Sequence, residues 1–440
     1  MNHQPSSMNY PDALAFLYDL QRFGIRLGLE NVLRLVEAFG HPEATFKSVH
    51  VAGTNGKGST AAFLGGILRA TSCRVGLYTS PHLLDFRERI LVDGHPISEQ
   101  ELAVLATEVA GVIDRIFAPS PLASPTFFEA VTALAFLHFA RVHVDWGVIE
   151  VGLGGRSDAT NILQEKVSVI TNIGLEHEEH LGDSLASIAA EKAGIIQEEG
   201  SVVSAAEGAA LDAIVRIVRE KGAHLIRVQD HYQVEHLGRS EQGETFRVTG
   251  RLRKYDSLQI PLAGRHQVLN AATALAVAEL LEEKGFRVGE AAIRQGLAAA
   301  RCPGRLQVVA TRPRILVDGA HNPPAIMALR AFLEEERLPG RLVVIFGVLK
   351  DKAWERMLAI LAPLASAIIL TRPESDRGAE PRVLASTASR CFRQVQIAET
   401  MPEALAAART VVGPEDTVLV TGSLFTVAGA LRALDFASLF

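Results

Sequence analysis

A short apolar run at residues 48–52 leads directly into the glycine-rich string Gly53-Thr-Asn-Gly-Lys-Gly-Ser-Thr60. Apolar residues recur at helical spacing over 61–68, so the segment predicts a strand, a tight loop and a helix. Backbone N–H groups of such a loop form a cradle for an anion at the helix N-terminus. Lys57 would reach the phosphates of a nucleotide there. The strict phosphate-loop pattern is broken because Gly58 separates Lys57 from Ser59, so a glycine-rich turn without a ligand is the alternative.

Short strand-like runs alternate with helical stretches through most of the chain. They lie at residues 146–151, 167–173, 201–205 and 224–228, and again at 314–317, 342–346, 367–370, 395–398 and 417–421. Such alternation predicts an α/β fold with parallel sheets covered by helices on both faces. Residues 229–262 predict a hairpin excursion, and 264–284 predict a helix. A helix gives way to Cys302-Pro-Gly304, so we expect one domain over 1–300 and a smaller α/β domain over 301–440.

The composition excludes several classes of protein. The chain has 440 residues, of which 48% are hydrophobic and 21% charged, as is usual for a folded protein of two or three domains. Its formal net charge of −6 disfavours a basic protein that binds nucleic acid through its charge. Its three cysteines are too scattered for a disulfide framework. No run of about 18 apolar residues occurs, so we expect no membrane span and a cytoplasmic location.

Three titratable residues follow the predicted elements of the first half. Glu150 ends the 146–151 strand, where open α/β sheets bind their ligands, and a carboxylate there suits Mg²⁺. His177 is expected to close the next strand. A lone histidine there is more often a core or surface residue, and imidazole is an unusual ligand for so hard a cation. Lys192 falls in a predicted helix that begins near Leu185 and, taken alone, is expected to face solvent.

Further motifs follow the glycine-rich string in order. They are Thr79-Ser-Pro-His-Leu83, Glu88-Arg-Ile90, Thr126-Phe-Phe-Glu129, Glu150-Val-Gly-Leu-Gly-Gly-Arg156, Asp158-Ala-Thr-Asn161, Ile173-Gly-Leu-Glu-His177, Glu191-Lys-Ala-Gly194, Gly264-Arg-His-Gln267 with Asn270, Pro303-Gly-Arg305, Asp318-Gly-Ala-His-Asn-Pro323 and Thr421-Gly-Ser-Leu-Phe425. With these motifs, over about residues 11–430, the chain resembles the folylpolyglutamate synthase/dihydrofolate synthase family of the Mur ligase superfamily. The resemblance implies a P-loop-containing, parallel-sheet ATPase domain followed by a smaller Rossmann-like C-terminal α/β domain.

The resemblance also implies sites for ATP and Mg²⁺. The nucleotide-binding residues are Gly53, Thr54, Asn55, Gly56, Lys57, Gly58, Ser59, Asn270, Arg305 and Asp318, and ATP is expected to lie between the two domains. The metal ligands are Ser59, Ser80, Glu150 and His177. Lys57, His177 and Lys192 are the implied catalytic residues, with Lys192 carbamylated, a change that turns a cation into an anion. Two positions depart from the family pattern, because Cys302 stands where Trp is frequent and Glu176 replaces the usual Asp.

The resemblance implies a pterin compound as the acceptor, held by the first domain. Candidate contacts are Gly28, Leu29, Glu30, Asn31, Thr126, Phe127, Phe128, Glu129, Ser157, Asp158 and Ala159, and His321 is placed near the incoming amino acid. Either Phe127 or Phe128 would stack on the pterin ring, with core packing as the alternative for both.

The implied reaction is ATP-driven addition of L-glutamate to dihydropteroate, to reduced folates or to both, through an acyl phosphate. We favour both acceptors, because Thr126–Glu129 and the Gly28 region resemble bifunctional bacterial forms. A folylpolyglutamate synthase alone, another Mur-type ligase acting on a cell-wall nucleotide, and a non-catalytic nucleotide-binding switch are the alternatives. The motifs at 79–90 and 126–129 argue against the cell-wall ligase, and the set of Glu150, His177 and Lys192 argues against the switch. We expect a monomer with no nucleic-acid or membrane partner.

Overall fold

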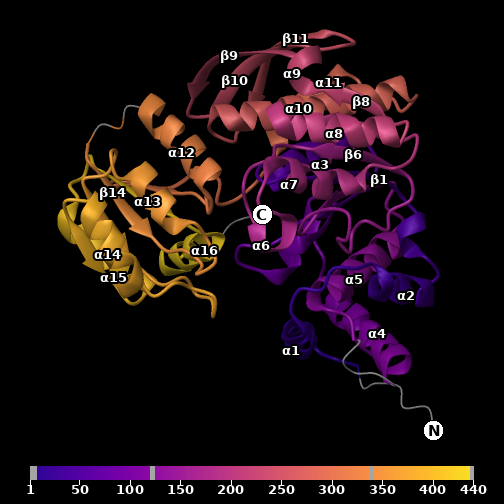
Figure 1. The fold of residues 1–440 in the computed structure, drawn as a ribbon, viewed down its shortest axis with the longest axis horizontal. Helices are drawn as coiled ribbons and strands as arrows, with labels where there is room; N and C mark the ends of the chain where they lie inside the picture. Colours follow the sequence, from indigo (N-terminus) through magenta and orange to yellow (C-terminus); the bar gives the residue numbers. More distant parts are fainter. Residues whose placement is uncertain (1–6, 119–123, 337, 339, 437–440) are drawn as a thin grey trace. The chain divides into compact units, whose positions relative to one another are not determined.

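The computed structural model describes residues 7–118, 124–336, 338 and 340–436. The chain divides into two compact units, each with its own largely parallel sheet (Figure 1). The first unit runs to Leu237 and also includes Phe246–Gln259 and Leu269–Ala300. The second unit takes Gly238–Thr245, Ile260–Val268 and the chain from Arg301 onward.

The main sheet of the first unit has eight strands among the described residues, in the order β4-β3-β2-β5-β1-β6-β7-β8. Their bounds are β1 Lys47–Ala52, β2 Val75–Tyr78, β3 Ile90–Val92, β4 His95–Pro96, β5 Trp146–Glu150, β6 Lys166–Ile170, β7 Ser201–Ser204 and β8 His224–Arg227. Strands β2, β5, β1, β6, β7 and β8 run parallel, whereas β3 pairs antiparallel with both β2 and β4. The predicted parallel sheet is confirmed, with an antiparallel edge that the sequence pattern did not indicate.

Helices of the first unit surround this sheet. They are α1 Tyr10–Asp19, α2 Glu30–Ala38, α3 Lys57–Arg69, α4 Glu99–Phe117, α5 Phe127–Arg141, α6 Glu178–Leu181, α7 Leu185–Lys192, α8 Gly208–Glu220, α9 Val228–His231, α10 Arg265–Glu283 and α11 Glu290–Ala299, of which α10 begins in the second unit. Neighbouring residues of β2 show that both faces are covered. Leu77 faces α3, because a Cβ built at Gly65 would lie 3.8 Å from its side chain. Tyr78 points to the other face and joins the apolar cluster of α1, α2, α4 and α5.

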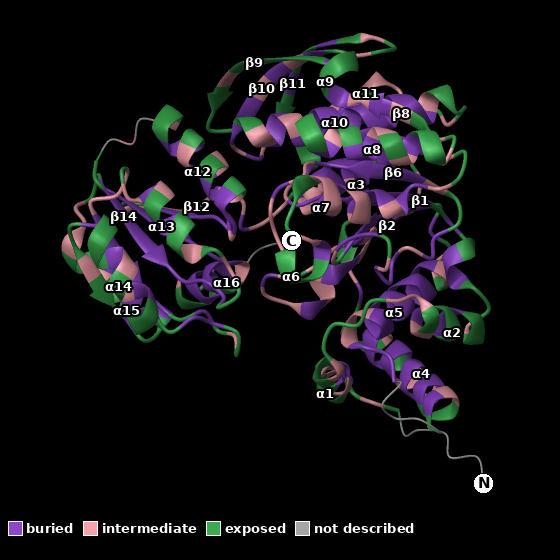
Figure 2. Ribbon diagram, in the orientation of Figure 1, coloured by how far each residue is buried: buried purple, intermediate pink, exposed green. Residues whose placement is uncertain are grey.

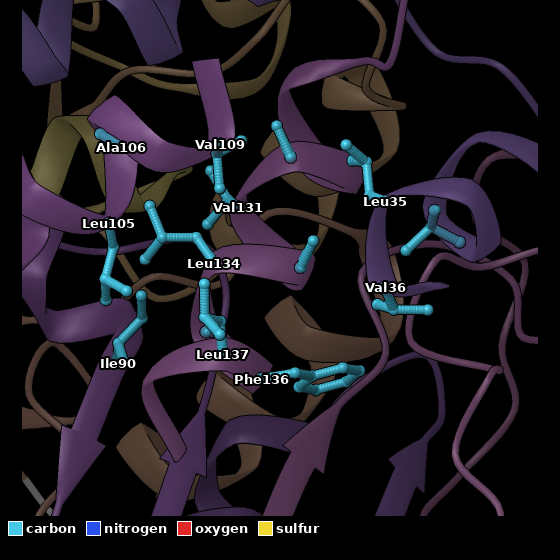
Figure 3. Packing of buried hydrophobic residues seen from close by; sticks show 14 of the residues in the cluster. Leu35, Val36, Ile90, Leu105, Ala106, Val109, Val131, Leu134, Phe136 and Leu137 are labelled. Atoms are coloured by element: carbon cyan, nitrogen blue, oxygen red, sulfur yellow. The ribbon is translucent and has the colours of Figure 1, made fainter. Parts of the chain in front are cut away.

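That cluster is the main core of the first unit (Figure 3). Leu134 and Phe136 of α5 are fully buried and lie among side chains of α2 and α4, including Leu35 and Val109. Full burial of one such side chain is worth about 1.5–3 kcal/mol. The central strand β1 is buried along all but its first residue (Figure 2). The strand that carries the glycine-rich loop is thus held firmly at the middle of the sheet.

Helices α3 and α11 cross at a pair of glycines. A Cβ at Gly66 would lie 2.4 Å from the backbone oxygen of Gly296, and a Cβ at Gly296 would lie 2.3 Å from the backbone of Ile67. Both distances are too short for any side chain. The two backbones are therefore in direct contact, and α3 is fixed on the side away from the sheet.

The second unit is built on a sheet of six strands in the order β12-β13-β17-β14-β15-β16 among the described residues. The strands are β12 Gln307–Thr311, β13 Arg314–Val317, β14 Leu342–Phe346, β15 Ala367–Leu370, β16 Val395–Ile397 and β17 Thr417–Thr421, and the helices are α12 Pro323–Glu336, α13 Trp354–Leu361, α14 Pro381–Cys391, α15 Met401–Val411 and α16 Leu424–Ala433. Among the strands of the described residues, only β12 at one edge of the sheet pairs antiparallel with its neighbour, and the other strands run parallel. Strand β14 is buried throughout (Figure 2).

Most predicted elements are confirmed. Four predicted strands of the second unit have the observed bounds, at 314–317, 342–346, 367–370 and 417–421. The polar stretch over 229–262 forms a separate three-stranded sheet of β9 Gln233–Ser240, β10 Gly243–Thr249 and β11 Lys254–Ile260. Among the described residues, every helix is too short or too polar to span a bilayer.

Candidate active site

The glycine-rich loop joins the end of β1 to the first residue of α3. Gly56 has a φ of 82°, a left-handed conformation that favours glycine. A Cβ at this position would lie 2.4 Å from Oδ1 of Asn270, a buried residue of α10. Asn270 therefore lies against the glycine-rich loop, and its role toward a nucleotide stays a prediction.

Residues 171–174, which follow β6, hold the loop in place. The backbone N–H of Thr54 donates to the carbonyl oxygen of Asn172 (2.8 Å), and the N–H of Asn55 donates to Oδ1 of the same asparagine (3.0 Å). The hydroxyl of Thr171 donates to the carbonyl oxygen of Asn55 (2.7 Å). The Thr54 hydroxyl donates to the carbonyl oxygen of Gly174 (3.1 Å). These bonds fix the loop before any ligand arrives.

Lys57, the first residue of α3, sits over this loop. Its Nζ donates to the carbonyl oxygens of Gly53 (3.0 Å) and Thr54 (3.1 Å). The ammonium thus lies beside the N-terminus of a helix, where the partial positive charge of the helix dipole also attracts anions. This is the arrangement that the sequence predicted for a phosphate site.

Replacing Gly56 by alanine is expected to weaken nucleotide binding by about 10-fold or more, because a left-handed alanine costs about 1–2 kcal/mol and its Cβ would collide with Asn270. Gly65→Ala, farther along α3, is the matched control, since its Cβ would lie an ordinary 3.8 Å from the side chain of Leu77. Calorimetric titration with ADP measures both variants. Equal affinities for the two variants would contradict the steric role of Gly56.

A carboxylate lies next to the loop. Glu150 ends β5, is 5% exposed, and accepts a hydrogen bond from the backbone N–H of Ser80 (3.1 Å). The built Cβ of Gly58 is also close to it, so Ser80, Glu150 and the loop meet at one point. The oxygen ligands there suit Mg²⁺, which keeps waters and phosphate oxygens as its other ligands. Within the described ranges, no group of three or more His, Cys, Asp or Glu side chains could hold a metal alone.

The prediction that His177 closes a strand is wrong. Strand β6 ends at Ile170, because the following residues leave the sheet to brace the loop. His177 instead precedes the short helix α6 with a left-handed φ of 53°. Its Nε2 lies 3.9 Å from Oε1 of Glu176. Its assignment as a metal ligand stays a prediction.

Lys192 ends α7 and is buried, not solvated as its sequence context alone suggested. Burial and, after it, the positive charge of Lys57 lower the pKa of Lys192 to about 7, against the opposite effect of Glu176 and Asp158. The amine is therefore largely uncharged at mildly alkaline pH. These influences place Lys192 in the electrostatic surroundings of the loop lysine.

A pocket of about 270 Å³ lies in the first unit, with Ser80 in its wall. It is lined by Gly24, Ile25, Arg26, Leu27, Gly28, Ser80, Pro81, Arg89, Thr126, Phe128, Glu129, Gly152, Leu153, Ser157, Asp158 and Ala159. Predicted contacts from three separate segments thus meet in one place. Leu29, Glu30, Asn31 and Phe127 do not line it. Sequence reasoning missed Arg89, although its motif was noted, and missed the residues just before Gly28.

The two neighbouring phenylalanines have different surroundings. Phe127 stacks on Tyr18, with ring centroids 5.8 Å apart and planes 5° apart. Phe128 lines the pocket and lies against the backbone of Gly152, where a Cβ would come within 2.5 Å of its ring. Phe128 is therefore the ring available to a ligand, and Phe127 packs in the wall behind it.

Thr126 and Glu129 form a capping box at the start of α5. The backbone N–H and hydroxyl of Thr126 both donate to Oε2 of Glu129, at 2.7 and 2.9 Å. Both residues are buried. The box orients the first turn of α5, which carries Phe128 into the pocket wall.

Two buried side chains, Thr160 and His50, hold Asp158 in place through successive hydrogen bonds. The Thr160 hydroxyl donates to Oδ1 of Asp158 (2.5 Å) and so accepts from Nε2–H of His50 (2.7 Å). The N–H of Leu153 donates to the other carboxylate oxygen (2.8 Å). Burial holds the pKa of His50 well below its usual value and raises the pKa of Asp158. A neutral His50 thus fixes the pocket aspartate through one hydroxyl.

Thr160→Val is expected to lower the free energy of unfolding by about 1–3 kcal/mol, because it leaves the buried His50 N–H without an acceptor. Urea denaturation measures the loss. The double variant His50→Leu/Thr160→Val is expected to lose less than the sum of the two single variants, since both members of the bond are then gone. Strictly additive losses would mean that the two residues are not coupled.

The predicted residues of the second unit also meet, at the end of β13. Asp318 accepts from the backbone N–H groups of Leu306 and Ala320, both at 2.9 Å. A Cβ at Gly319 would lie 3.0 Å from a guanidinium nitrogen of Arg305. Nδ1 of His321 is 2.9 Å from the carbonyl oxygen of Gly319. Arg305, Asp318 and His321 therefore form one cluster, and their roles toward a ligand stay predictions.

Comparison with known proteins places both units in one family. The Mur ligase middle domain matches residues 51–278, and the Mur ligase glutamate ligase domain matches residues 304–424. The chain is 33% identical over 428 residues to the dihydrofolate synthase/folylpolyglutamate synthase of Bacillus subtilis, covering 97% of this chain and 99% of the relative. It is 36% identical over 432 residues to a probable bifunctional folylpolyglutamate synthase/dihydropteroate synthase of Haloferax volcanii, covering 96% of this chain but 50% of that longer protein.

Solved structures agree over the whole length. Escherichia coli FolC in complex with DHPP and ADP has a TM-score of 0.88 and 34% identity, covering 98% of this chain and 99% of the other. Mycobacterium tuberculosis folylpolyglutamate synthase complexed with ADP and AMPPCP has a TM-score of 0.90 and 32% identity, covering 96% and 99%. The chain therefore belongs to the folylpolyglutamate synthase/dihydrofolate synthase family of the Mur ligases.

Proposed function

We propose that this protein is an ATP-dependent amide ligase that adds L-glutamate to dihydropteroate and to reduced folates. One observation carries the proposal, namely that Ser80 belongs to two places at once. Its backbone N–H binds Glu150 beside the phosphate loop, and the residue also lines the pocket. An acceptor held in the pocket would therefore extend its carboxylate toward the γ-phosphate of a nucleotide on the loop.

The chemistry follows from this adjacency. A carboxylate is a poor acyl donor, so the γ-phosphoryl group of ATP is first transferred to it and gives an acyl phosphate. The glutamate amine then attacks the acyl carbon, a tetrahedral intermediate forms, and phosphate leaves as the amide bond is made. Lys57 and the N–H groups at the start of α3 stabilise the charge on the transferred group. When Mg²⁺ is bound, by Ser59, Ser80, Glu150 and His177 in the proposal, it neutralises phosphate charge.

Lys192 is proposed to be carbamylated. Its neutral amine attacks CO₂, a nitrogen–carbon bond forms and a proton is released, so that a carbamate anion replaces a cation. The lowered pKa of Lys192 supports this, because only the uncharged amine reacts. The resulting oxygens would add anionic ligands close to Lys57.

ADP release by the purified full chain tests the proposal. Glutamate-dependent release is expected with dihydropteroate and with tetrahydrofolate, and each glutamylated product is identified by mass spectrometry. Release with tetrahydrofolate alone would reduce the activity to folylpolyglutamate synthesis. Release only with a cell-wall nucleotide precursor, or nucleotide binding without turnover on any acceptor, would overturn the proposal. The Lys57→Met variant controls for contaminating ATPase.

A further inference from the structure

Arg89 is a buried cation in the wall of the pocket. It ends the 3₁₀ turn Phe86–Arg89 just before β3 and is 8% exposed. Its Nε donates to Nδ1 of His82 (2.9 Å), and its guanidinium carbon lies 5.3 Å from the ring centroid of Phe127 and 5.7 Å from that of Phe86. The guanidinium thus packs against two neighbouring aromatic rings, whose centroids are 6.2 Å apart, and Arg89 lines the pocket.

The head of this guanidinium has no protein partner in the described part of the chain. No described carboxylate lies within ion-pair distance of Arg89, and its terminal nitrogens donate to no described residue. They are also absent from the polar atoms sealed inside the protein, so they open onto the pocket that Arg89 lines. A buried charge with unused donors is costly. Cation–π contacts return only about 0.5–2 kcal/mol of that cost. The arrangement is explained if a ligand completes it.

The ligand atom must be a hydrogen-bond acceptor, because a guanidinium only donates. Which end of the substrate brings it follows from the pocket, on the basis of the function proposed above. The reacting carboxylate must approach the phosphate loop, yet no residue of Gly53–Ser59 lines the pocket. The pocket therefore holds the other end, the pterin ring. The exocyclic carbonyl oxygen of that ring has two lone pairs, so it can accept hydrogen bonds from the guanidinium.

We propose that Arg89 is a specificity-determining residue, and that its guanidinium donates hydrogen bonds to the exocyclic 4-oxo oxygen of the acceptor's pterin ring. The site then selects rings with an oxygen at that position. It rejects rings with an amino group there, because two sets of donors would face each other. Sites built around a polar group discriminate strongly against analogues that lack it.

The test compares dihydropteroate with its 4-amino analogue on the full chain. The wild type is expected to favour the 4-oxo acceptor in kcat/KM by about 30-fold or more. Arg89→Met keeps the length of the side chain. It is expected to lose about 30-fold with the 4-oxo acceptor and less than about 3-fold with the 4-amino one, at an unchanged KM for ATP. Its Tm is expected to stay level or rise, since a buried unpaired charge is removed.

Arg87→Met is the matched control. That guanidinium lies on the same turn, pairs with Asp85 at 2.6 Å and does not line the pocket. It should leave the preference for the 4-oxo ring unchanged. If Arg89→Met folds poorly, Arg89→Lys makes the same comparison, because it keeps the charge but loses the fork.

Two outcomes would overturn the assignment. Equal losses on both acceptors would mean that Arg89 binds a group that they share, such as the carboxylate. A fall in Tm with the 4-oxo preference intact would mean that Arg89 serves only the fold. Failure of the proposed function is separate, because the wild type itself would then show no acceptor-dependent ADP release.

Discussion

Lys57→Met is expected to lower kcat for ADP release by about 10³-fold, the range lost when a preorganised charge on a transition state is removed. In the structure Nζ of Lys57 lies over the carbonyl oxygens of Gly53 and Thr54. A bound phosphate would therefore attract the Lys57 ammonium in competition with two uncharged carbonyl oxygens only. The rate of ADP release, measured at fixed times with saturating ATP, acceptor and glutamate, gives kcat.

Lys47→Met is the control for this prediction. Lys47 lies at the opposite, exposed end of the same strand, so its loss removes an equal charge without touching the loop. Its kcat should stay within about 2-fold of the wild type, as for most surface changes. A Lys57→Met enzyme with near-normal kcat would show that phosphoryl transfer does not depend on this ammonium.

Lys192→Met is expected to lower kcat by about 10²-fold, because the anionic carbamate close to the transferred phosphate is lost. Short carboxylic acids added to a smaller variant, Lys192→Ala, should restore part of the rate by supplying the missing anion. Lys166→Met is the matched control, since burial also lowers the pKa of Lys166 to about 7, but the neighbouring cation that contributes there is Lys221 and not the loop lysine. Failure of rescue in Lys192→Ala, with normal binding of ADP, would speak against a carbamate.

The pH dependence follows from the pKa of Lys192. Below a pH of about 7 the amine is protonated and cannot take up CO₂. Wild-type activity should therefore fall as the pH drops from about 8 to 6, less steeply when bicarbonate is added. In the unfolded chain the unmodified lysine holds its proton to a higher pH. Without CO₂, the buried charge therefore lowers the free energy of unfolding by its full amount below a pH of about 7, and this penalty is relieved as the pH rises above 7.

The local sequence pattern was sufficient to predict those parts of the candidate site that a single short segment determines. The loop between β1 and α3, and Glu150 at the end of β5, could both be predicted because strand, glycine and helix signals lie within a few residues. His177 could not be placed, since the residues before it leave the sheet to bond the loop, and only tertiary contacts decide that.

The pocket could be predicted in part. Thr126–Glu129 and Ser157–Ala159 were identified by their motifs, but motif order does not say which side chains face one cavity. Phe127 and Phe128 are successive residues on α5, about 100° apart around the helix, so only one of them lines the pocket. Arg89 was missed because its proposed role follows from the lack of a described carboxylate beside it, and only the folded structure shows which residues are its neighbours.

The glycine crossing of α3 and α11 has a mechanical consequence. Gly66 and Gly296 leave no space between the two backbones, so α3 cannot move toward α11 without displacing it. The phosphate loop lies at the start of α3, and α11 ends at Ala299, directly before the passage into the second unit at Arg301. A movement of α3 toward α11 would therefore be passed by backbone contact to the helix that leads into the second unit, without an intervening side chain.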